Sequence, residues 1–215
     1  MGSNAYLLPD YASVEMQEHP ELRGKSIAVC GDPEARHGIV LTASYPAKRM
    51  GVKTAMPIWE AKQHCRDLIV VPASYGKYQK YSSYVREIFR DYTDQVESFG
   101  LDEAWLDITG SLGLFGDPVK IAKEISDRIK RELGITVSIG VSFNKITAKL
   151  GSDYKKPDAI TVIEPDNYKQ IVYPLPVGDL LYVAMPHSAN SAVTAFAPSV
   201  SLRKQTLKSS RAGLV

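Results

Sequence analysis

The sequence has few cysteines and no long apolar run, and these absences exclude several classes of protein. Cys30 and Cys65 are the only two cysteines among 215 residues, and they stand far apart in apolar contexts. A disulfide framework is therefore excluded, and we expect two buried thiols in a reducing compartment. No apolar stretch approaches the roughly 20 residues of a membrane span, and we recognise no signal peptide. We therefore expect a cytoplasmic protein without a membrane partner.

A strong excess of charge of either sign is also absent. Lysine and arginine number 26 against 24 aspartates and glutamates, so the formal net charge is only +2. This balance gives no evidence for a polyanionic partner, because the clustering of charges matters more than their sum. The composition, 44% hydrophobic and 23% charged, is ordinary for a globular protein. The length allows one large domain or two small ones.

Apolar periodicity predicts alternating strands and helices. Short apolar runs predict strands at residues 26–31, 37–42, 68–71, 95–101, 104–109, 135–141 and 160–163. Helical spacing predicts helices at residues 56–66, 75–92, 117–133 and 144–154, the third capped by Asp117 and ended by Gly134. The order fits an α+β sheet with helices packed on one face. Two segments emerge, a smaller inserted one at about residues 16–74 and a second one at residues 75–165.

Asp102 and Glu103 are adjacent acids inside an apolar, strand-like stretch at residues 96–111. Like charges in half-buried surroundings are costly unless a cation offsets them. Carboxylate oxygens suit hard ions such as Mg²⁺, which usually arrives with substrate phosphates, so the pair indicates metal-assisted phosphoryl chemistry. Successive strand residues face opposite sides, so both acids serve one site only at a turn, which Gly100 allows. The alternative, a hairpin bend with two solvated acids, stays open on these residues alone.

Four stretches of the chain resemble the Y-family translesion DNA polymerases, in the DNA polymerase IV branch, and they occur in the family's order. They lie at residues 19–32, 37–78, 96–111 and 140–162, and the similarity covers about residues 11–183. The resemblance implies a palm at residues 75–165, a ferredoxin-like antiparallel sheet with helices on one face, whose first strand lies in residues 1–15. It also implies a small inserted α/β fingers domain at residues 16–74 and the start of a helical thumb at residues 166–183.

The resemblance implies a low-fidelity, lesion-bypass DNA polymerase that adds dNTPs to the 3′ end of a primer. Asp102 matches the family's metal-ligand aspartate and Glu103 the catalytic glutamate beside it, and together they are expected to hold two Mg²⁺ ions. Tyr11 matches the steric-gate aromatic, whose ring excludes a ribose 2′-OH. Primer–template DNA is the expected partner, together with a sliding clamp for the full-length protein.

The resemblance also implies a triphosphate site. Thr42, Tyr45 and Lys48 fall in the finger motif that holds the incoming triphosphate, and Lys156 matches a second triphosphate-binding lysine. Lysine stands at position 48 where arginine is common, so the bidentate fork of a guanidinium is missing. Taken singly, each residue has a structural alternative, such as a core tyrosine at Tyr11 or a solvated helix face at Lys48. Their joint occurrence in one order favours the functional interpretation.

The front of the chain departs from the family pattern. The family carries an aspartate, its third metal ligand, five positions before the gate aromatic, and here that position holds Tyr6. A tyrosine cannot replace a carboxylate on Mg²⁺. Asp10 directly precedes Tyr11, so on a strand its side chain would face the other side, and Pro9 is expected to prevent a regular ladder at that point.

The end of the chain departs from the pattern as well. Residues 184–215 have no apolar periodicity and are rich in serine and alanine, whereas the family continues into a helical thumb. We predict that this tail is poorly ordered. We also hypothesise that it is an out-of-frame translation of the thumb, which sequencing of the encoding DNA would test.

Two other functions stay open. Because a metal ligand and the thumb are lost, the chain could be a catalytically inert relative that keeps the fold and at most binds nucleotide or DNA weakly. A nucleotide cyclase uses a similar palm and acidic pair, but no cyclase loop is visible and the finger motif argues against it.

Overall fold

A computed structural model describes residues 4–31 and 38–181, with the backbone alone for residues 4–9. The serine- and alanine-rich tail at residues 184–215 lies outside this described part. The chain divides into two compact units, residues 1–162 and residues 163–215. Within the described ranges, no helix has the length and apolar character needed to cross a bilayer.

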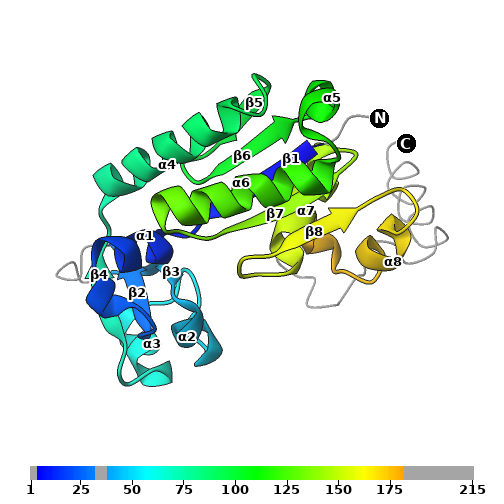
Figure 1. Ribbon diagram of the computed structural model, residues 1–215. Coiled ribbons are helices and arrows are strands. Elements are labelled where there is room, and N and C mark those ends of the chain that lie inside the picture. The colour runs from blue at the N-terminus through cyan, green and yellow to red at the C-terminus, as the bar shows by residue number, and fades with distance from the viewer. Residues whose placement is uncertain (1–3, 32–37, 182–215) are drawn as a thin grey trace, which may run out of the picture. The chain divides into compact units, whose positions relative to one another are not determined.

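Five strands form the main sheet, in the order β5-β6-β1-β7-β8 (Figure 1). Their bounds are Asn4–Pro9 for β1, Val96–Phe99 for β5, Glu103–Asp107 for β6, Val137–Ser142 for β7 and Ile160–Ile163 for β8. The central strand β1 pairs antiparallel with β6 on one side and β7 on the other. The strand that begins at Glu103 therefore lies directly beside the N-terminal strand.

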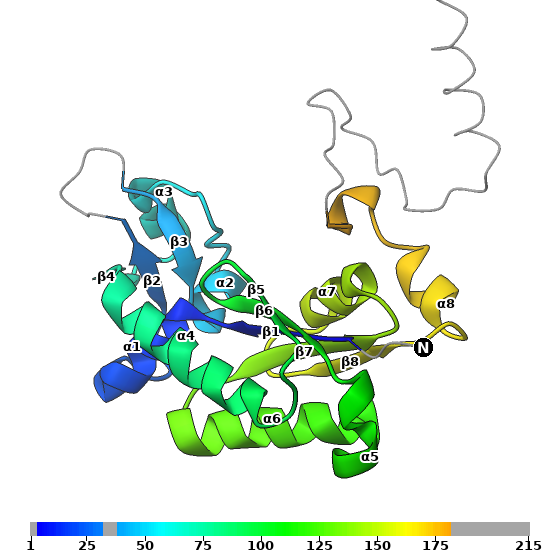
Figure 2. The ribbon, with the colours of Figure 1, turned by 90° about the horizontal axis from the view of Figure 1, so that it is seen from above.

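Helices cover both faces of this sheet. α4 (Tyr75–Arg90) and α6 (Pro118–Leu133) bury an apolar stripe against one face, where alternate β7 residues such as Ile139 join the core. α7 (Lys145–Tyr154) packs on the opposite face (Figure 2). The prediction of helices on one face is thus correct for α4 and α6 and wrong for α7.

Small residues on β7 explain the position of α7. Ser138, Gly140 and Ser142 alternate with the core residues of the strand and face α7. The hydroxyl groups of Ser142 and Thr147 lie 2.6 Å apart. A Cβ at Gly140 would overlap the backbone carbonyl oxygen of Ala148. The close approach of the helix to the strand therefore depends on the absence of a side chain at this position.

The caps of α6 agree with the prediction. The Asp117 carboxylate accepts hydrogen bonds from the backbone N–H groups of Val119 and Lys120, both at 3.0 Å. Gly134 ends the helix with φ 69°, in the left-handed region that favours glycine.

A second sheet has three strands in the order β3-β2-β4. β2 (Ile27–Cys30) pairs antiparallel with β3 (Val40–Ala43) and parallel with β4 (Ile69–Pro72). The short helices α2 (Tyr45–Arg49) and α3 (Ile58–His64) contribute Ala47 and Ala61 to the apolar core of this sheet. Cys30 and Cys65 are free thiols in its core, as the sequence predicted.

The junction between β1 and α1 (Tyr11–Glu18) differs from the prediction. The ladder with β7 continues through Pro9, which pairs with Val137. The prediction that Pro9 breaks the ladder is wrong, because Pro9 is the last strand residue, where a missing N–H costs little. Asp10 is the N-cap of α1 and Tyr11 its first residue. The argument that Asp10 and Tyr11 face opposite sides of a strand is therefore wrong as well.

The remaining elements are short. They are η1 (Pro20–Leu22), η2 (Thr109–Ser111), α5 (Leu112–Phe115), α8 (Tyr168–Val172) and η3 (Val177–Asp179).

Candidate active site

A cavity of about 240 Å³ gathers most of the residues singled out in the sequence. It is lined by residues of both sheets and of the turns beside them, all within residues 1–162. The sequence-predicted residues among them are Tyr11, Thr42, Tyr45, Lys48, Asp102 and Lys156. The fold thus brings residues from separate stretches of the sequence around one space.

Tyr11 is held in place by stacking. Its ring lies parallel to that of Tyr78 on α4, with ring centroids 4.4 Å apart and an angle of 6° between the planes. Tyr78 is buried and donates a hydrogen bond of 2.6 Å to the buried carboxylate of Glu15. Burial, together with the negative charge of Asp102, raises the pKa of Tyr11 to about 12. Tyr11 is therefore a neutral phenol whose ring is fixed against α4.

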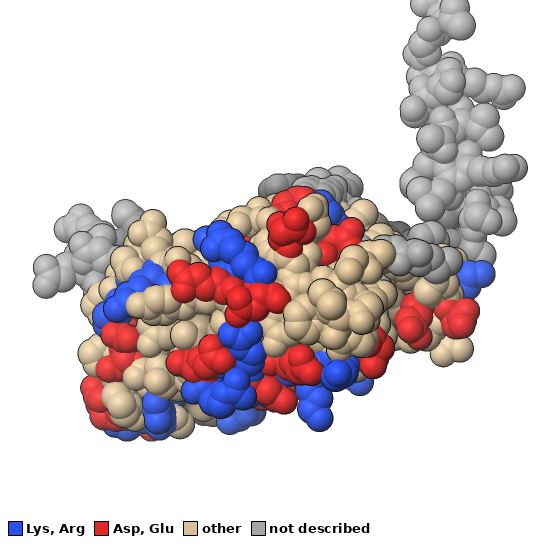
Figure 3. Space-filling view, turned by 45° about the horizontal axis from the view of Figure 1, so that its top comes forward, with Lys and Arg blue, Asp and Glu red and all other residues tan. Residues whose placement is uncertain are grey.

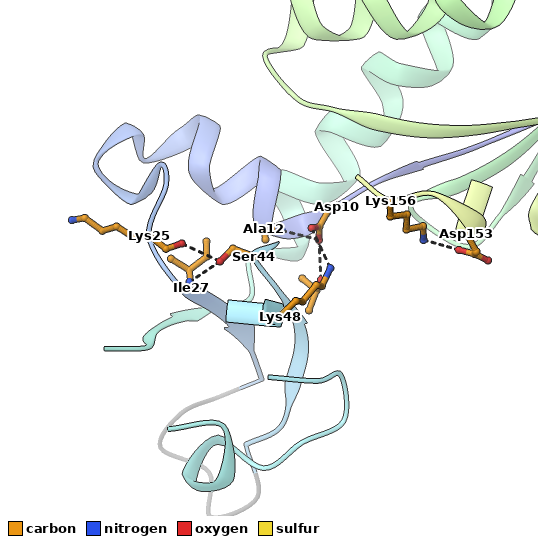
Figure 4. A network of polar contacts seen from close by, with 9 residues as sticks. Asp10, Ala12, Lys25, Ile27, Ser44, Lys48, Asp153 and Lys156 are labelled. Carbon is orange, nitrogen blue, oxygen red and sulfur yellow. Dashed lines mark hydrogen bonds and ion pairs between the residues drawn. The ribbon is translucent and has the colours of Figure 1, made fainter. Parts of the chain in front are cut away.

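The start of α2 is anchored by Ser44. Its hydroxyl donates to the carbonyl oxygen of Lys25 at 3.0 Å and accepts from the N–H of Ile27 at 2.9 Å (Figure 4). These hydrogen bonds fix the turn that presents Tyr45 and Lys48 to the cavity. The Lys48 ammonium lies 4.6 Å from the centre of the Tyr45 ring, a distance typical of a cation–π contact.

Asp10 is a cavity residue that we did not assign to the site from the sequence. Its carboxylate accepts hydrogen bonds from the Thr42 hydroxyl at 2.8 Å and the Ala12 N–H at 3.2 Å. It also forms an ion pair with Lys48 at 3.7 Å (Figure 4). An acid directly before a helical segment is an N-cap signal, and this signal was available in the sequence.

Asp102 and Glu103 have different surroundings. Gly100 adopts φ 73° in the turn between β5 and β6, as predicted, and Asp102 lines the cavity. Burial raises the pKa of Asp102, and the neighbouring charge of Glu103 raises it further. The Glu103 carboxylate pairs with Lys149 of α7 at 3.1 Å, and Glu103 is not among the residues that line this cavity.

Asp153 forms ion pairs with two lysines, Lys149, which also contacts Glu103, and Lys156, which lines the cavity. Lys149 contacts Asp153 at 2.8 Å as well as Glu103, and the other oxygen of Asp153 contacts Lys156 at 2.6 Å. Burial favours the neutral form of Asp153, but the two lysines outweigh it and lower its pKa. The i,i+4 spacing along α7 allows the pair of Lys149 with Asp153. Lys156 lies just after the end of the helix, and we predicted neither pair from the sequence.

Tyr6 lies in β1, the central strand of the main sheet. It pairs with Trp105 of β6 and with Gly140 of β7. Within residues 4–31 and 38–181, no group of three or more histidine, cysteine, aspartate or glutamate residues has an arrangement suited to a metal ion. The backbone of the first strand is therefore in place, with a tyrosine at the position where the family resemblance predicts a carboxylate.

The face of the molecule seen in Figure 3 carries charges of both signs close together. In the view of Figure 3, lysine and arginine side chains alternate with aspartate and glutamate side chains. This pattern agrees with the small net charge of +2. On this face neither sign of charge predominates.

The comparisons with known sequences identify relatives over most of this chain. Residues 9–153 match the family described as impB/mucB/samB. DNA polymerase IV of Acetivibrio thermocellus is 60% identical over 173 residues, which make up 80% of this chain and 43% of the relative. DNA polymerase IV 1 of Bacillus subtilis is 45% identical over 170 residues, 79% of this chain and 41% of the relative. The chain therefore spans less than half the length of these two relatives.

Solved structures show the same fold. The crystal structure of DinB from Sulfolobus solfataricus has a TM-score of 0.77 and 31% identity, covering 85% of this chain and 54% of that chain. An insertion ternary complex of Dbh DNA polymerase gives the same four values. These likenesses confirm the predicted α+β fold class.

Proposed function

This chain belongs to the impB/mucB/samB family of Y-family DNA polymerases, as its sequence predicted, and from that membership we propose its function. It is the catalytic-core portion of a low-fidelity, lesion-bypass DNA-directed DNA polymerase that adds dNTPs to a primer 3′ end. The observation that supports this most is the single cavity that gathers Tyr11, Asp102 and the candidate phosphate-binding residues. Residues 16–74 are assigned to the fingers, 75–165 with the strand in 1–15 to the palm, and 166–183 to the start of the thumb.

The cavity has the donors that a triphosphate requires. Lys48 and Lys156 supply positive charge, and the hydroxyl groups of Thr42 and Tyr45 supply neutral donors on the same lining. Charge-assisted hydrogen bonds to phosphate oxygens are stronger than neutral ones. Burial, and next the charge of Asp10, raises the pKa of Tyr45 to about 12. Its hydroxyl therefore stays protonated at neutral pH and can donate a hydrogen bond to a phosphate oxygen.

Tyr11 discriminates between sugars by its position. The ring is clamped on Tyr78 and lines the same cavity as the phosphate donors, so it cannot rotate away without giving up the stacking on Tyr78. A ribose 2′-OH that points toward the ring meets a fixed aromatic surface. The substrate class is therefore a deoxynucleoside triphosphate.

Asp102 and Glu103 are the residues that would hold two Mg²⁺ ions. Their fit to a hard cation follows from the chemistry of two adjacent carboxylates. Burial raises the pKa of Asp102, and a bound cation would favour its ionised form. When bound, the ions would neutralise charge on the triphosphate. Lys149 holds the Glu103 carboxylate beside α7, and Asp153 links this lysine to Lys156.

A second function, a catalytically inert relative, has support from one specific observation. Tyr6 stands at the position of the family's third carboxylate, in the middle of β1 and opposite Trp105. The described residues contain no further acid grouped with Asp102 and Glu103 as a metal site. Such a chain would keep the fold and bind nucleotide or DNA weakly.

Primer–template DNA is the proposed macromolecular partner. The solved Dbh DNA polymerase structures include an insertion ternary complex and a post-insertion binary complex, and they align with this chain at 31% identity. A sliding clamp is proposed as a partner of the full-length protein, and the cytoplasm as its location.

Primer extension tests the proposed activity. We would compare the unaltered chain, the Tyr6→Asp variant and the double variant Tyr6→Asp/Asp102→Ala, each with primer–template DNA, dNTPs and Mg²⁺. We expect extension by Tyr6→Asp and background rates for the double variant. Equal background rates for all three proteins would contradict the polymerase assignment, and an unaltered chain at the Asp102→Ala level beside an active Tyr6→Asp variant would favour the inert function.

A further inference from the structure

Asp10 places a negative charge among the groups that are proposed to receive the triphosphate. One carboxylate oxygen accepts the hydrogen bond from the Thr42 hydroxyl at 2.8 Å, and the other lies 3.7 Å from the Lys48 ammonium. Both partners line the cavity and belong to the candidate triphosphate site. Asp10 therefore contacts the same donors that a phosphate oxygen would use.

Thr42 cannot serve both anions at once. Its hydroxyl has a single O–H donor, and that donor is directed at Asp10. A phosphate that enters this part of the cavity must displace the carboxylate or go without the Thr42 hydrogen bond. It also meets the like charge of the Asp10 carboxylate, and like charges repel more strongly in a partly buried site than in bulk water.

The fold holds Asp10 in this position. Asp10 is the N-cap of α1 and accepts a hydrogen bond from the Ala12 N–H at 3.2 Å. Its side chain is only 21% exposed. The ring of the next residue, Tyr11, is stacked on Tyr78. The carboxylate therefore belongs to an anchored helix start and is not a surface side chain that turns into the cavity by chance.

The second phosphate-binding lysine has a different acidic partner. Lys156 is paired with Asp153 (Figure 4). Asp153 does not line the cavity, and it also contacts Lys149. Asp153 thus neutralises its lysines from outside the cavity, whereas Asp10 neutralises Lys48 from within it. Of these two acids, Asp10 is the one that occupies space and donors needed by an anion.

We propose that Asp10 is an internal competitor of the incoming triphosphate, a carboxylate that occupies Thr42 and Lys48 and weakens the binding of polyphosphate anions. This inference rests on the proposed function, because it takes the cavity as the triphosphate site. In this proposal Asp10 sets the affinity of the cavity for polyphosphate anions, and the effect does not require a metal ion. Removal of the Asp10 charge is then expected to tighten anion binding, the opposite of what loss of a substrate ligand would do.

The Asp10→Asn variant isolates the charge. Asparagine keeps an oxygen acceptor for the Ala12 and Thr42 donors and is as good an N-cap as aspartate, so α1 and the fold are expected to be retained. The probe is inorganic tripolyphosphate, titrated calorimetrically into the full chain without divalent ions. We expect the Kd of Asp10→Asn to be at least about fivefold lower than that of the unaltered chain.

A control at the rim of the same cavity separates a specific effect from general electrostatics. Asp158 also lines the cavity, but its carboxylate pairs with Lys130 at 2.7 Å. Asp158 has φ 53°, which asparagine tolerates, so Asp158→Asn removes the same charge without a backbone penalty. We expect it to change the Kd less than about twofold. An equal gain from both variants would overturn the specific role of Asp10.

A double-mutant cycle with Lys48→Ala completes the test. The gain from Asp10→Asn is expected to fall at least about threefold in the Lys48→Ala background, because the lysine is then unavailable to the anion. If Lys48→Ala and Lys156→Ala weaken tripolyphosphate binding but Asp10→Asn leaves it unchanged, the competitor proposal fails and the proposed triphosphate site stands. If neither lysine variant alters binding in either background, the proposed site itself fails.

A repeat of the titration with Mg²⁺ distinguishes a competitor at position 10 from the opposite role, a metal ligand that helps to bind the anion. As a competitor, Asp10 weakens binding with and without the ion, so Asp10→Asn tightens it in both conditions. A variant that binds tripolyphosphate less tightly than the unaltered chain when Mg²⁺ is present would mark Asp10 as a metal ligand and overturn the proposal.

Discussion

The phosphate side and the acid side of the cavity differ in how much of the family's site they retain. On the phosphate side, formed by β3, α2 and the turn after α7, all four predicted residues line the cavity. On the acid side, formed by β1 and the start of β6, the backbone of β1 pairs with both neighbours but carries Tyr6 at the carboxylate position. The comparison shows that strand pairing, which uses main-chain groups, is retained with a tyrosine at position 6.

Under the proposed function, the difference between the two sides predicts that nucleotide binding and catalysis are separable in this chain. The phosphate side depends on lysines and hydroxyl groups that are present, whereas the acid side depends on a set of carboxylates that is incomplete. Experiments that alter one side at a time test this division.

The largest effect is expected for Asp102 on the acid side. In the Tyr6→Asp background, Asp102→Ala removes a ligand from ions that supply several kcal/mol of charge stabilisation, so we expect the extension rate to fall about 100-fold or more. Single-turnover extension measures the rate. The affinity for tripolyphosphate without metal ions is the control and is expected not to weaken. A loss smaller than about threefold would remove Asp102 from the catalytic role.

The next effect is expected for the packing of α7 against β7, at Gly140. Gly140→Ala places a methyl group against the Ala148 carbonyl, and we expect a loss of about 3 kcal/mol in the free energy of unfolding, at the upper end of overpacking costs. Urea denaturation measures this change. Gly76→Ala, in α4 with open space around its position, is the matched control and is expected to be neutral or slightly stabilising. Equal stabilities of the two variants would contradict the packing of α7 on β7.

A smaller effect is expected where the two sides meet, at Tyr11. Tyr11→Ala removes the ring stacked on Tyr78 and opens space beside the proposed sugar position. We expect the preference for dATP over ATP, measured as a ratio of Kd values with Ca²⁺ in place of Mg²⁺, to fall about tenfold, or roughly 1.4 kcal/mol. Tyr11→Phe keeps the ring and serves as the control. An unchanged ratio in Tyr11→Ala would sink the gate assignment.

The smallest effect is the pH dependence of stability caused by Asp102. Its pKa in the folded protein is raised above the unfolded value of 3.8, so the folded state binds more protons between these two values. The stabilising contribution of the protonated form is present below 3.8 and is lost as the pH rises through the raised pKa. Ionised Asp102 therefore costs stability at neutral pH.

Thermal unfolding as a function of pH checks this sign. We expect Asp102→Asn to have a higher Tm than the unaltered chain at neutral pH, with a difference that shrinks toward acidic pH. A Tm difference of the opposite sign, or one that grows on acidification, is incompatible with a destabilising charge at this position.

The sequence predicted the elements whose signals are local. α6 was recognised because its apolar stripe has helical spacing and its ends carry Asp117 and Gly134, which act directly on the neighbouring backbone. The positions of Tyr11, Lys48 and Lys156 on one cavity followed from a family resemblance. Composition or periodicity would not have brought them together.

What the sequence did not predict depends on contacts between distant segments. The placement of α7 on the second face follows from the small residues of β7, and such residues alone fit many arrangements. The ion pairs of Asp10 with Lys48 and of Glu103 with Lys149 join residues that stand far apart in the sequence. No local pattern specifies such pairs, so only the structure shows them.

The affinity of the unaltered chain for dATP tests the central claim, that a triphosphate site persists beside an incomplete acid centre. Calorimetry with Ca²⁺ in place of Mg²⁺ would compare this chain with the double variant Lys48→Ala/Lys156→Ala. We expect measurable binding that weakens about 100-fold in the double variant, roughly one power of ten for each charge-assisted hydrogen bond that the substitutions remove. Equal affinities in the two proteins would contradict the account.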